Sequence, residues 1–155
     1  NYLNINVDAE VFHLVQVIDR GLSDGVLTLH KDVRLRVTYH DPCELTRHME
    51  IIEEPRRILS RIPGIEFVEL ERNRKDSTCC GGGGLMRLLF PKVSQEIAIE
   101  KILREVLPLG VSTIVTACPF CEYVLSDAIR AIGNESVLKV MDISEVILLA
   151  MGVEK

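Results

Sequence analysis

The sequence lacks an apolar run long enough to cross a membrane. Its longest, VILLAMGV at residues 146–153, is far shorter than the about 20 residues that a spanning helix needs. It also lacks a basic stripe, because 18 lysines and arginines stand against 23 aspartates and glutamates, for a net charge of −5. We therefore expect neither direct membrane insertion nor binding to nucleic acid.

A secretory signal peptide and an initiating methionine are missing as well, since the chain opens NYLNINVDAEV. That opening predicts that residues 1–155 are a fragment, the C-terminal part, of a longer polypeptide. No internal repeat or low-complexity segment interrupts the chain. Its 155 residues, of which 47% are hydrophobic and 26% charged, predict a single globular domain with its own core.

Cysteine is absent before residue 43 and after residue 121. The five cysteines between these limits are Cys43, Cys79, Cys80, Cys118 and Cys121. An odd number disfavours a fully paired disulfide framework. Cys79 and Cys80 are also poor partners for each other, because neighbouring Cα atoms lie about 3.8 Å apart whereas a disulfide usually spans about 4.4–6.8 Å. We therefore expect a reducing, cytoplasmic location and thiols reserved for metal or redox chemistry.

Apolar periodicity alternates between helix and strand along the chain. Helices are predicted at residues 8–20, 55–62, 85–90, 92–107, 119–132 and 144–152, with Gly21 ending the first and Ser144 as N-cap of the last. Strands are predicted at residues 33–39, 65–70, 112–117 and 137–143. This pattern predicts an α/β fold: a three-layer open sheet, mainly parallel, of about four strands with helices on both faces, as in Rossmann-like folds.

All five cysteines fall on connections that follow predicted strands. Cys43 follows the first strand, the Cys79–Cys80 pair the second, and Cys118 and Cys121 the third. In an open parallel sheet these connections lie along one edge, which is the edge where such sheets bind ligands. Cysteines far apart in sequence are therefore expected to converge.

Several sulfur-based sites are open at this point. A tetrahedral zinc ion would use four of the five thiols, often from two C-x2-C pairs, and a cubane [4Fe–4S] cluster also uses four. Adjacent residues in extended chain point to opposite sides, so Cys79 and Cys80 together suit a larger or more open multi-iron centre. A thioredoxin-like dithiol at Cys118 and Cys121 is a further alternative, and a turn with two incidental thiols is the plainest interpretation of the pair.

The residues beside the cysteines suit a supporting role. Four consecutive glycines would let the backbone approach a bound group and donate its N–H groups, and two prolines would shape the turns. His40 and His48 are either ligands or hydrogen-bonding neighbours. Arg47 either offsets cluster charge or is solvated, and the EEPRR and RNRK segments are interpreted as solvated charge. The supporting residues predicted in this way are His40, Pro42, Gly81, Gly82, Gly83, Gly84 and Pro119.

Three motifs in order carry a family resemblance: YHDPC, then CCGGGG, then ACPFC. Together with EPRRIL and IPGIEFVEL, they resemble the cysteine-rich CCG domain from about Val33 to Gly152. That domain occurs in the B and D subunits of heterodisulfide reductases. It also occurs in iron–sulfur subunits of glycolate oxidase, of anaerobic glycerol-3-phosphate dehydrogenase and of lactate-utilisation enzymes.

The resemblance implies a [4Fe–4S]-type cluster, which is non-cubane in the best-understood members, with all five cysteines as ligands. It implies an iron–sulfur redox domain of a heterodisulfide reductase-like oxidoreductase that transfers electrons or reduces a disulfide. Partners would be other oxidoreductase subunits, of flavin or ferredoxin type, which could hold the domain at a membrane. The domain alone is expected not to complete a catalytic cycle. The alternative is a zinc-binding docking domain without redox chemistry.

Overall fold

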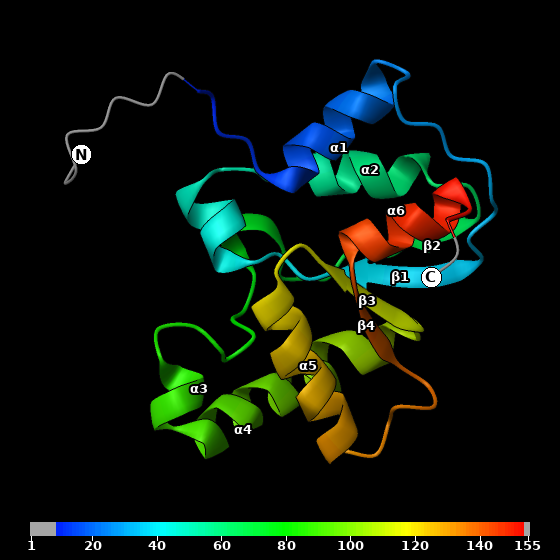
Figure 1. The fold of residues 1–155 in the computed structure, drawn as a ribbon. Helices are drawn as coiled ribbons and strands as arrows, with labels where there is room; N and C mark the ends of the chain where they lie inside the picture. Colours follow the sequence, from blue (N-terminus) through cyan, green and yellow to red (C-terminus); the bar gives the residue numbers. More distant parts are fainter. Residues whose placement is uncertain (1–8, 154–155) are drawn as a thin grey trace.

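Four parallel strands form the only sheet in residues 9–153, the part of the chain that the computed structural model describes (Figure 1). Its order is β2-β1-β3-β4, and each neighbouring pair is parallel. The bounds are β1 Leu35–Tyr39, β2 Ile65–Phe67, β3 Thr113–Thr116 and β4 Lys139–Asp142. The predicted three-layer α/β fold is confirmed, with a sheet that is parallel throughout.

Helices cover both faces of this sheet (Figure 1). α1 (Leu14–Ser23), α2 (Glu54–Arg61) and α6 (Ile143–Met151) share one core with inward side chains of β1 and β3, such as Tyr39 and Val115. α4 (Pro91–Lys101) and α5 (Pro119–Ala131) share the other core, where Ile114 of β3 is fully buried. Successive strand residues thus bury opposite faces, as period-two alternation requires.

The first helix differs from its prediction at both ends. It was expected at residues 8–20, of which residue 8 lies outside the described part of the chain, but α1 begins at Leu14. His13 caps it, because the His13 ring nitrogen Nδ1 accepts from the Val15 N–H at 3.2 Å and Gln16 accepts the His13 N–H at 3.0 Å. Gly21 does not end the helix but lies inside it, where a Cβ would stand 2.8 Å from Leu27.

The last helix has a different N-cap from the predicted one. Asp142, not Ser144, caps α6: its Oδ1 accepts from the Ser144 N–H at 2.8 Å, and Glu145 accepts the Asp142 N–H at 3.3 Å. The reason is that β4 ends at Asp142 and the helix begins at the next residue, so no linker separates them.

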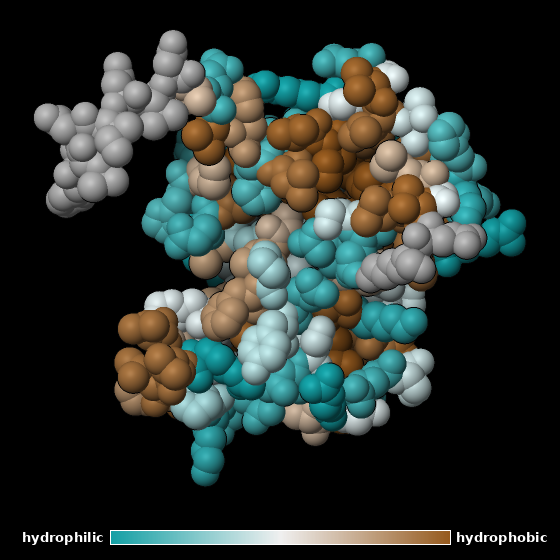
Figure 2. Space-filling model, viewed as in Figure 1, coloured by the Kyte–Doolittle hydropathy of each residue, from teal (hydrophilic) through white to brown (hydrophobic). Residues whose placement is uncertain are grey.

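The helical run after the glycines is longer and less regular than one α-helix. α4 continues through a π-type segment, η3 (Ile102–Val106), and a 3-10 turn, η4 (Leu107–Leu109), which ends at Gly110 with φ +62°. It is preceded by α3 (Met86–Leu89), one short turn. The α3 region exposes Leu85, Leu88 and Phe90, and Figure 2 shows this apolar surface in brown at lower left.

Candidate metal centre

The candidate site lies at the carboxyl ends of β1 and β3, the two central strands. The chain leaves β1 towards α2 on one face of the sheet, and leaves β3 into α5 on the other. Where consecutive connections diverge in this way, a crevice opens outside the carboxyl ends of the strands. His40 and Cys43 follow β1, while Cys118 and Cys121 follow β3, so strand order accounts for their approach.

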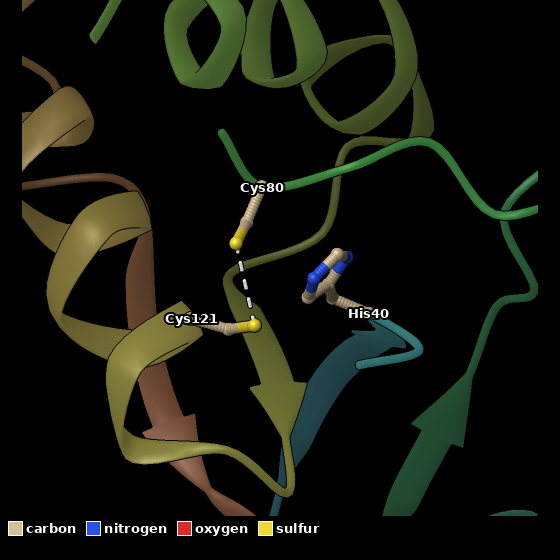
Figure 3. Close-up of side chains that lie close together, drawn as sticks. All are labelled: His40, Cys80 and Cys121. Atoms are coloured by element: carbon tan, nitrogen blue, oxygen red, sulfur yellow. Dashed lines mark hydrogen bonds between the residues drawn. The ribbon is translucent and has the colours of Figure 1, made fainter. Parts of the chain in front are cut away.

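Three donor groups meet at the centre of this crevice. A ring nitrogen of His40 and the sulfurs of Cys80 and Cys121 all lie within 4.8 Å of one another (Figure 3). The two sulfurs are 3.3 Å apart, and all three residues are buried, with 1–4% of their surface exposed. They come from the β1 turn, the loop after β2 and the first turn of α5.

Each of the five cysteines lines at least one of two cavities at this edge of the sheet. The smaller, of about 10 Å³, is lined by Cys43, Cys79, Cys80 and Cys121. The larger, of about 190 Å³, is lined by Cys43, Cys118 and Cys121. Cys43 and Cys121 belong to both, so one group occupying both cavities would face every thiol of the chain.

The adjacent pair is split between two environments, as extended backbone at this point predicts. Cys80 is buried and faces Cys121, whereas Cys79 is exposed and accepts the Gly81 N–H at 3.2 Å. The two thiols therefore reach different parts of the site.

Hydrogen bonding links the acidities of the thiols. The Cys121 thiol, followed by Cys79 and His40, holds the pKa of Cys80 well below its ordinary value. Hydrogen bonds with Cys118 and Cys80, in turn, raise the pKa of Cys121. The pKa of Cys118 falls to about 6, chiefly through Cys121 and also through backbone N–H groups at the start of α5. Hydrogen bonding with Cys121 thus favours a thiolate within this group of cysteines.

Burial favours the neutral form of the His40 imidazole. Its complete burial lowers its pKa from the ordinary 6.5, which outweighs the interaction with Cys80 that acts in the opposite direction. A neutral ring keeps one nitrogen lone pair for a metal or a hydrogen bond. Nδ1 of this ring has no hydrogen-bond partner in the described residues, and neither has the buried hydroxyl of Thr46, which lines the same small cavity.

The segment EEPRR is not uniformly solvated, which corrects the sequence-based interpretation. Arg56 is only 6% exposed. Its guanidinium donates to both carboxylate oxygens of Asp41 at 2.8 Å, to Glu69 at 2.8 and 2.9 Å, and to the carbonyl of Ile52 at 2.8 Å. All five N–H groups are used. Burial acts to lower the pKa of Arg56, but the hydrogen bonds to Asp41 and Glu69 outweigh it and raise that pKa.

The loop that carries Cys79 and Cys80 is held from two sides. On one side the Arg47 guanidinium donates to the carbonyls of Lys75 at 3.0 Å and Ser77 at 2.6 Å, so it is bound to the loop and not simply solvated. On the other side Lys101, 3% exposed, donates to the Thr78 hydroxyl at 2.7 Å and to Glu105 at 2.8 Å.

The sequence analysis did not identify three residues that hold the site together: Asp41, Arg56 and Lys101. The position of Asp41 between His40 and Cys43 was the one available signal. The contacts that tie Arg56 to Asp41 and Lys101 to Thr78 had no sequence signal, because these partners lie 15 and 23 residues away.

The glycines and prolines have local structural reasons. At Gly81, φ is +88° and a Cβ would stand 2.5 Å from the Ser94 carbonyl of α4, while at Gly82 it would meet the Phe120 ring at 2.9 Å. Pro119 opens α5 at its first position, where its fixed φ suits a helix. Buried Pro42 accepts the Thr46 N–H at 2.9 Å. Approach of the glycine backbone to a bound group stays a prediction.

The donor set fits a sulfur-ligated metal centre. Soft thiolates with one imidazole favour zinc or iron–sulfur centres over hard, oxygen-ligated ions. The buried Nδ1 of His40, which lacks a partner among the described residues, fits a group bound within this cavity. Assignment of all five cysteines as ligands stays a prediction.

Fold and site together define a class: a parallel α/β domain with a thiol-lined crevice at the switch point of its sheet. The family model for the CCG "Cysteine-rich domain" matches residues 37–126, and the chain belongs to this family. The resemblance inferred from its three motifs is thereby confirmed. Within residues 9–153, no helix is both long and apolar enough to traverse a lipid bilayer.

Several curated proteins are similar over nearly the whole chain. The B subunit of fumarate reductase (CoM/CoB) from Methanothermobacter marburgensis is 41% identical over 150 residues, which are 97% of this chain and 29% of the relative. The D subunit of dihydromethanophenazine:CoB–CoM heterodisulfide reductase from Methanosarcina barkeri is 34% identical over 92% of this chain and 34% of the relative. The probable iron-sulfur-binding oxidoreductase FadF of Bacillus subtilis is 32% identical over 98% and 21%. The chain thus spans about a third or less of these relatives.

Proposed function

We propose that this chain is the iron–sulfur redox domain of a heterodisulfide reductase-like oxidoreductase, which transfers electrons or reduces a disulfide at a centre held by its five cysteines. The observation that carries the proposal is that every cysteine lines at least one of two cavities, and that Cys43 and Cys121 line both. A centre with one or two thiol ligands would leave the other cysteines unexplained. Five thiols in one crevice exceed what a tetrahedral ion uses.

A bound [4Fe–4S]-type cluster, cubane or non-cubane, would supply one-electron redox chemistry at this edge of the sheet. The chain's own residues would provide ligands, charge compensation and enclosure. Hydrogen bonding with Cys121 lowers the pKa of Cys80 and of Cys118, which favours thiolate ligands at this site. The start of α5 donates backbone N–H groups toward Cys118, which favours negative charge there. Cys79, which is exposed, is the thiol that an incoming disulfide or partner would meet first.

The partners in this proposal are other oxidoreductase subunits of flavin or ferredoxin type. Two of the relatives are themselves named as subunits, of a heterodisulfide reductase and of a fumarate reductase. A third is named EtfAB:quinone oxidoreductase, from Syntrophomonas wolfei, and is 32% identical over 97% of this chain and 22% of its own length. The unpaired thiols favour a cytoplasmic location, or one at a membrane through such partners.

A second candidate is a zinc-stabilised docking domain without redox chemistry. It is favoured by the compactness of the His40, Cys80 and Cys121 donors, which lie within 4.8 Å of one another and would suit a single ion with one further ligand. On this alternative one of Cys43, Cys79 and Cys118 would supply the fourth ligand, and the other two would have no role in metal binding.

Anaerobic purification separates the two candidates. The redox domain is expected to be brown, with iron and acid-labile sulfide near stoichiometric, and to give an EPR signal in one of its oxidation states. Colourless protein with one zinc, after anaerobic handling and cluster reconstitution, would contradict the redox proposal.

Two variants then test the number of ligands. Cys79→Ser and Cys80→Ser are each expected to change the EPR signal, because each removes one thiolate. Thr78→Ser is the matched control: it lies on the same loop and keeps the hydroxyl that Lys101 and Glu105 contact. If either cysteine variant leaves the signal as Thr78→Ser does, the five-ligand arrangement is wrong.

A further inference from the structure

Two cysteine-bearing segments are joined by a single buried carboxylate. Asp41 stands two residues before Cys43, at the end of β1, and is 3% exposed. Its Oδ2 accepts the backbone N–H of Arg74 at 2.8 Å. Arg74 belongs to the 3-10 turn η2 (Arg74–Asp76), which leads into the loop that carries Cys79. The carboxylate therefore ties the Cys43 turn directly to the backbone before the cysteine pair.

Arg56 holds this carboxylate in a fixed orientation. Nη1 and Nη2 of its guanidinium donate to Oδ1 and Oδ2 of Asp41, both at 2.8 Å, a two-pronged geometry that sets direction as well as distance. Glu69, just after β2, accepts hydrogen bonds from Nη2 and Nε of the same guanidinium at 2.8 and 2.9 Å. Since Arg56 lies on α2, the helix anchors two of the three connections that carry cysteines, those after β1 and β2.

The network also satisfies its own buried charges. Arg56 has no unused N–H group, and Oδ2 of Asp41 accepts from both Arg56 and Arg74. A buried carboxylate without such partners would be costly, and removal of one partner leaves the other charge uncompensated. The carboxylate of Asp41 contacts Arg56 of α2 and the backbone N–H of Arg74. None of these contacts is to a thiol.

We propose that Asp41, held by Arg56, is a positioning residue that sets the separation between the Cys43 turn and the Cys79–Cys80 loop, and so the affinity of the site for thiophilic metal. The proposal deepens the proposed function, because it concerns the same thiols. It is independent of whether iron–sulfur or zinc is the resident group, since either needs the two segments at a fixed distance.

The chain contains a matched control for this network. Asp19 of α1 is 7% exposed and pairs with Arg57 and Arg61 of α2, with Arg57 Nη2 donating to it at 2.6 Å. Asp19 and Asp41 are thus both buried carboxylates bound to arginines of one helix. Only Asp41 contacts a cysteine-bearing loop.

The test is a titration of the anaerobic, metal-free 155-residue chain with Cd²⁺ alone, followed by the ultraviolet sulfur-to-cadmium charge-transfer band. Asp41→Asn, which keeps the size of the side chain, is expected to weaken Cd²⁺ binding by about 10-fold, the low end of the cost of losing a group bonded directly to a metal ligand, because Asp41 acts on the thiols through the backbone. It is also expected to reduce the number of bound thiolates per ion. Asp19→Asn is expected to change neither, although both variants lower Tm.

The proposal is overturned if Asp41→Asn binds Cd²⁺ with the affinity and thiolate count of the wild type. It is overturned equally if Asp19→Asn weakens binding as much, because the effect would then be general loss of stability. Should Asp41→Asn not fold, the same titration is made with Arg56→Lys and, as its control, Arg57→Lys. Both keep the charge and lose the fork, and only Arg56→Lys is expected to weaken binding. The iron and sulfide analysis tests the redox function separately, since this titration contains no iron.

Discussion

The four glycines after Cys80 provide a graded test of why this segment is glycine. Two separate constraints act on them: a positive φ, and close approach of other atoms to the missing Cβ. Gly81 has both, with φ +88° and the Ser94 carbonyl at 2.5 Å, and Gly84 has only a positive φ of +60°. Gly82 has only the close approach, to Phe120 at 2.9 Å and to Val124 at 3.0 Å, and Gly83 has neither constraint.

The magnitudes follow from these constraints. For Gly81→Ala, a left-handed residue costs about 1–2 kcal/mol and overpacking against a backbone atom about 1–3 kcal/mol, so we expect a loss of about 3 kcal/mol. Gly84→Ala carries only the cost of the left-handed backbone, about 1–2 kcal/mol. Gly82→Ala should cost about 1–2 kcal/mol, because the Phe120 ring is 45% exposed and can move, whereas Val124, 3.0 Å from the added Cβ, is buried. Gly83→Ala should be neutral or stabilise by about 0.4–1 kcal/mol, since it restricts the unfolded chain.

Urea unfolding of the metal-free variants gives these free energies directly, and thermal unfolding should place Tm of Gly81→Ala about 6–12 °C below that of the wild type. The order of destabilisation is the result that matters. If Gly83→Ala proves as destabilising in the metal-free chain as Gly81→Ala, the reasoning from φ and contact is refuted. If Gly83→Ala is neutral there but weakens Cd²⁺ binding, the glycine backbone does approach a bound group, as the sequence predicted.

Two further variants test contacts that only the structure revealed. Asp142→Ala should cost about 1 kcal/mol in chemical unfolding because it removes the cap of α6, and Ser144→Ala, at the position predicted from sequence, should cost clearly less; equal losses would contradict the assignment of the cap. Lys101→Met should cost about 2–3 kcal/mol because it leaves the carboxylate of Glu105 partly buried beside Thr78 without its cation. The double variant with Glu105→Gln should recover part of this loss, and a double variant no more stable than the single one would rule out the electrostatic explanation.

Local rules placed most elements but not all of their ends. The alternation of apolar periods identified every strand of the sheet, and prolines marked the starts of α2, α4 and α5 within one residue. The first helix was misplaced because His13 caps it, and histidine is not a preferred N-cap. A cap depends on which side chain can reach the free N–H groups, so nearby polar residues compete for it.

The sequence by itself determined which donor groups the site can offer and where they lie in the topology. Five thiols on strand-to-helix connections, in a chain that alternates helix and strand, have one edge of a parallel sheet on which to meet. The spacing of the motifs also identified the family. This information is local, because residue type and position along each element suffice to convey it.

Tertiary structure alone decided which groups touch. It put His40 beside Cys80 and Cys121, and buried Arg56 within a segment that looked solvated. Such contacts join residues that are distant in sequence, and a charge can be buried only where folding supplies its partners. No local pattern encodes that pairing, since it depends on the strand order β2-β1-β3-β4 and on how the helices pack against it.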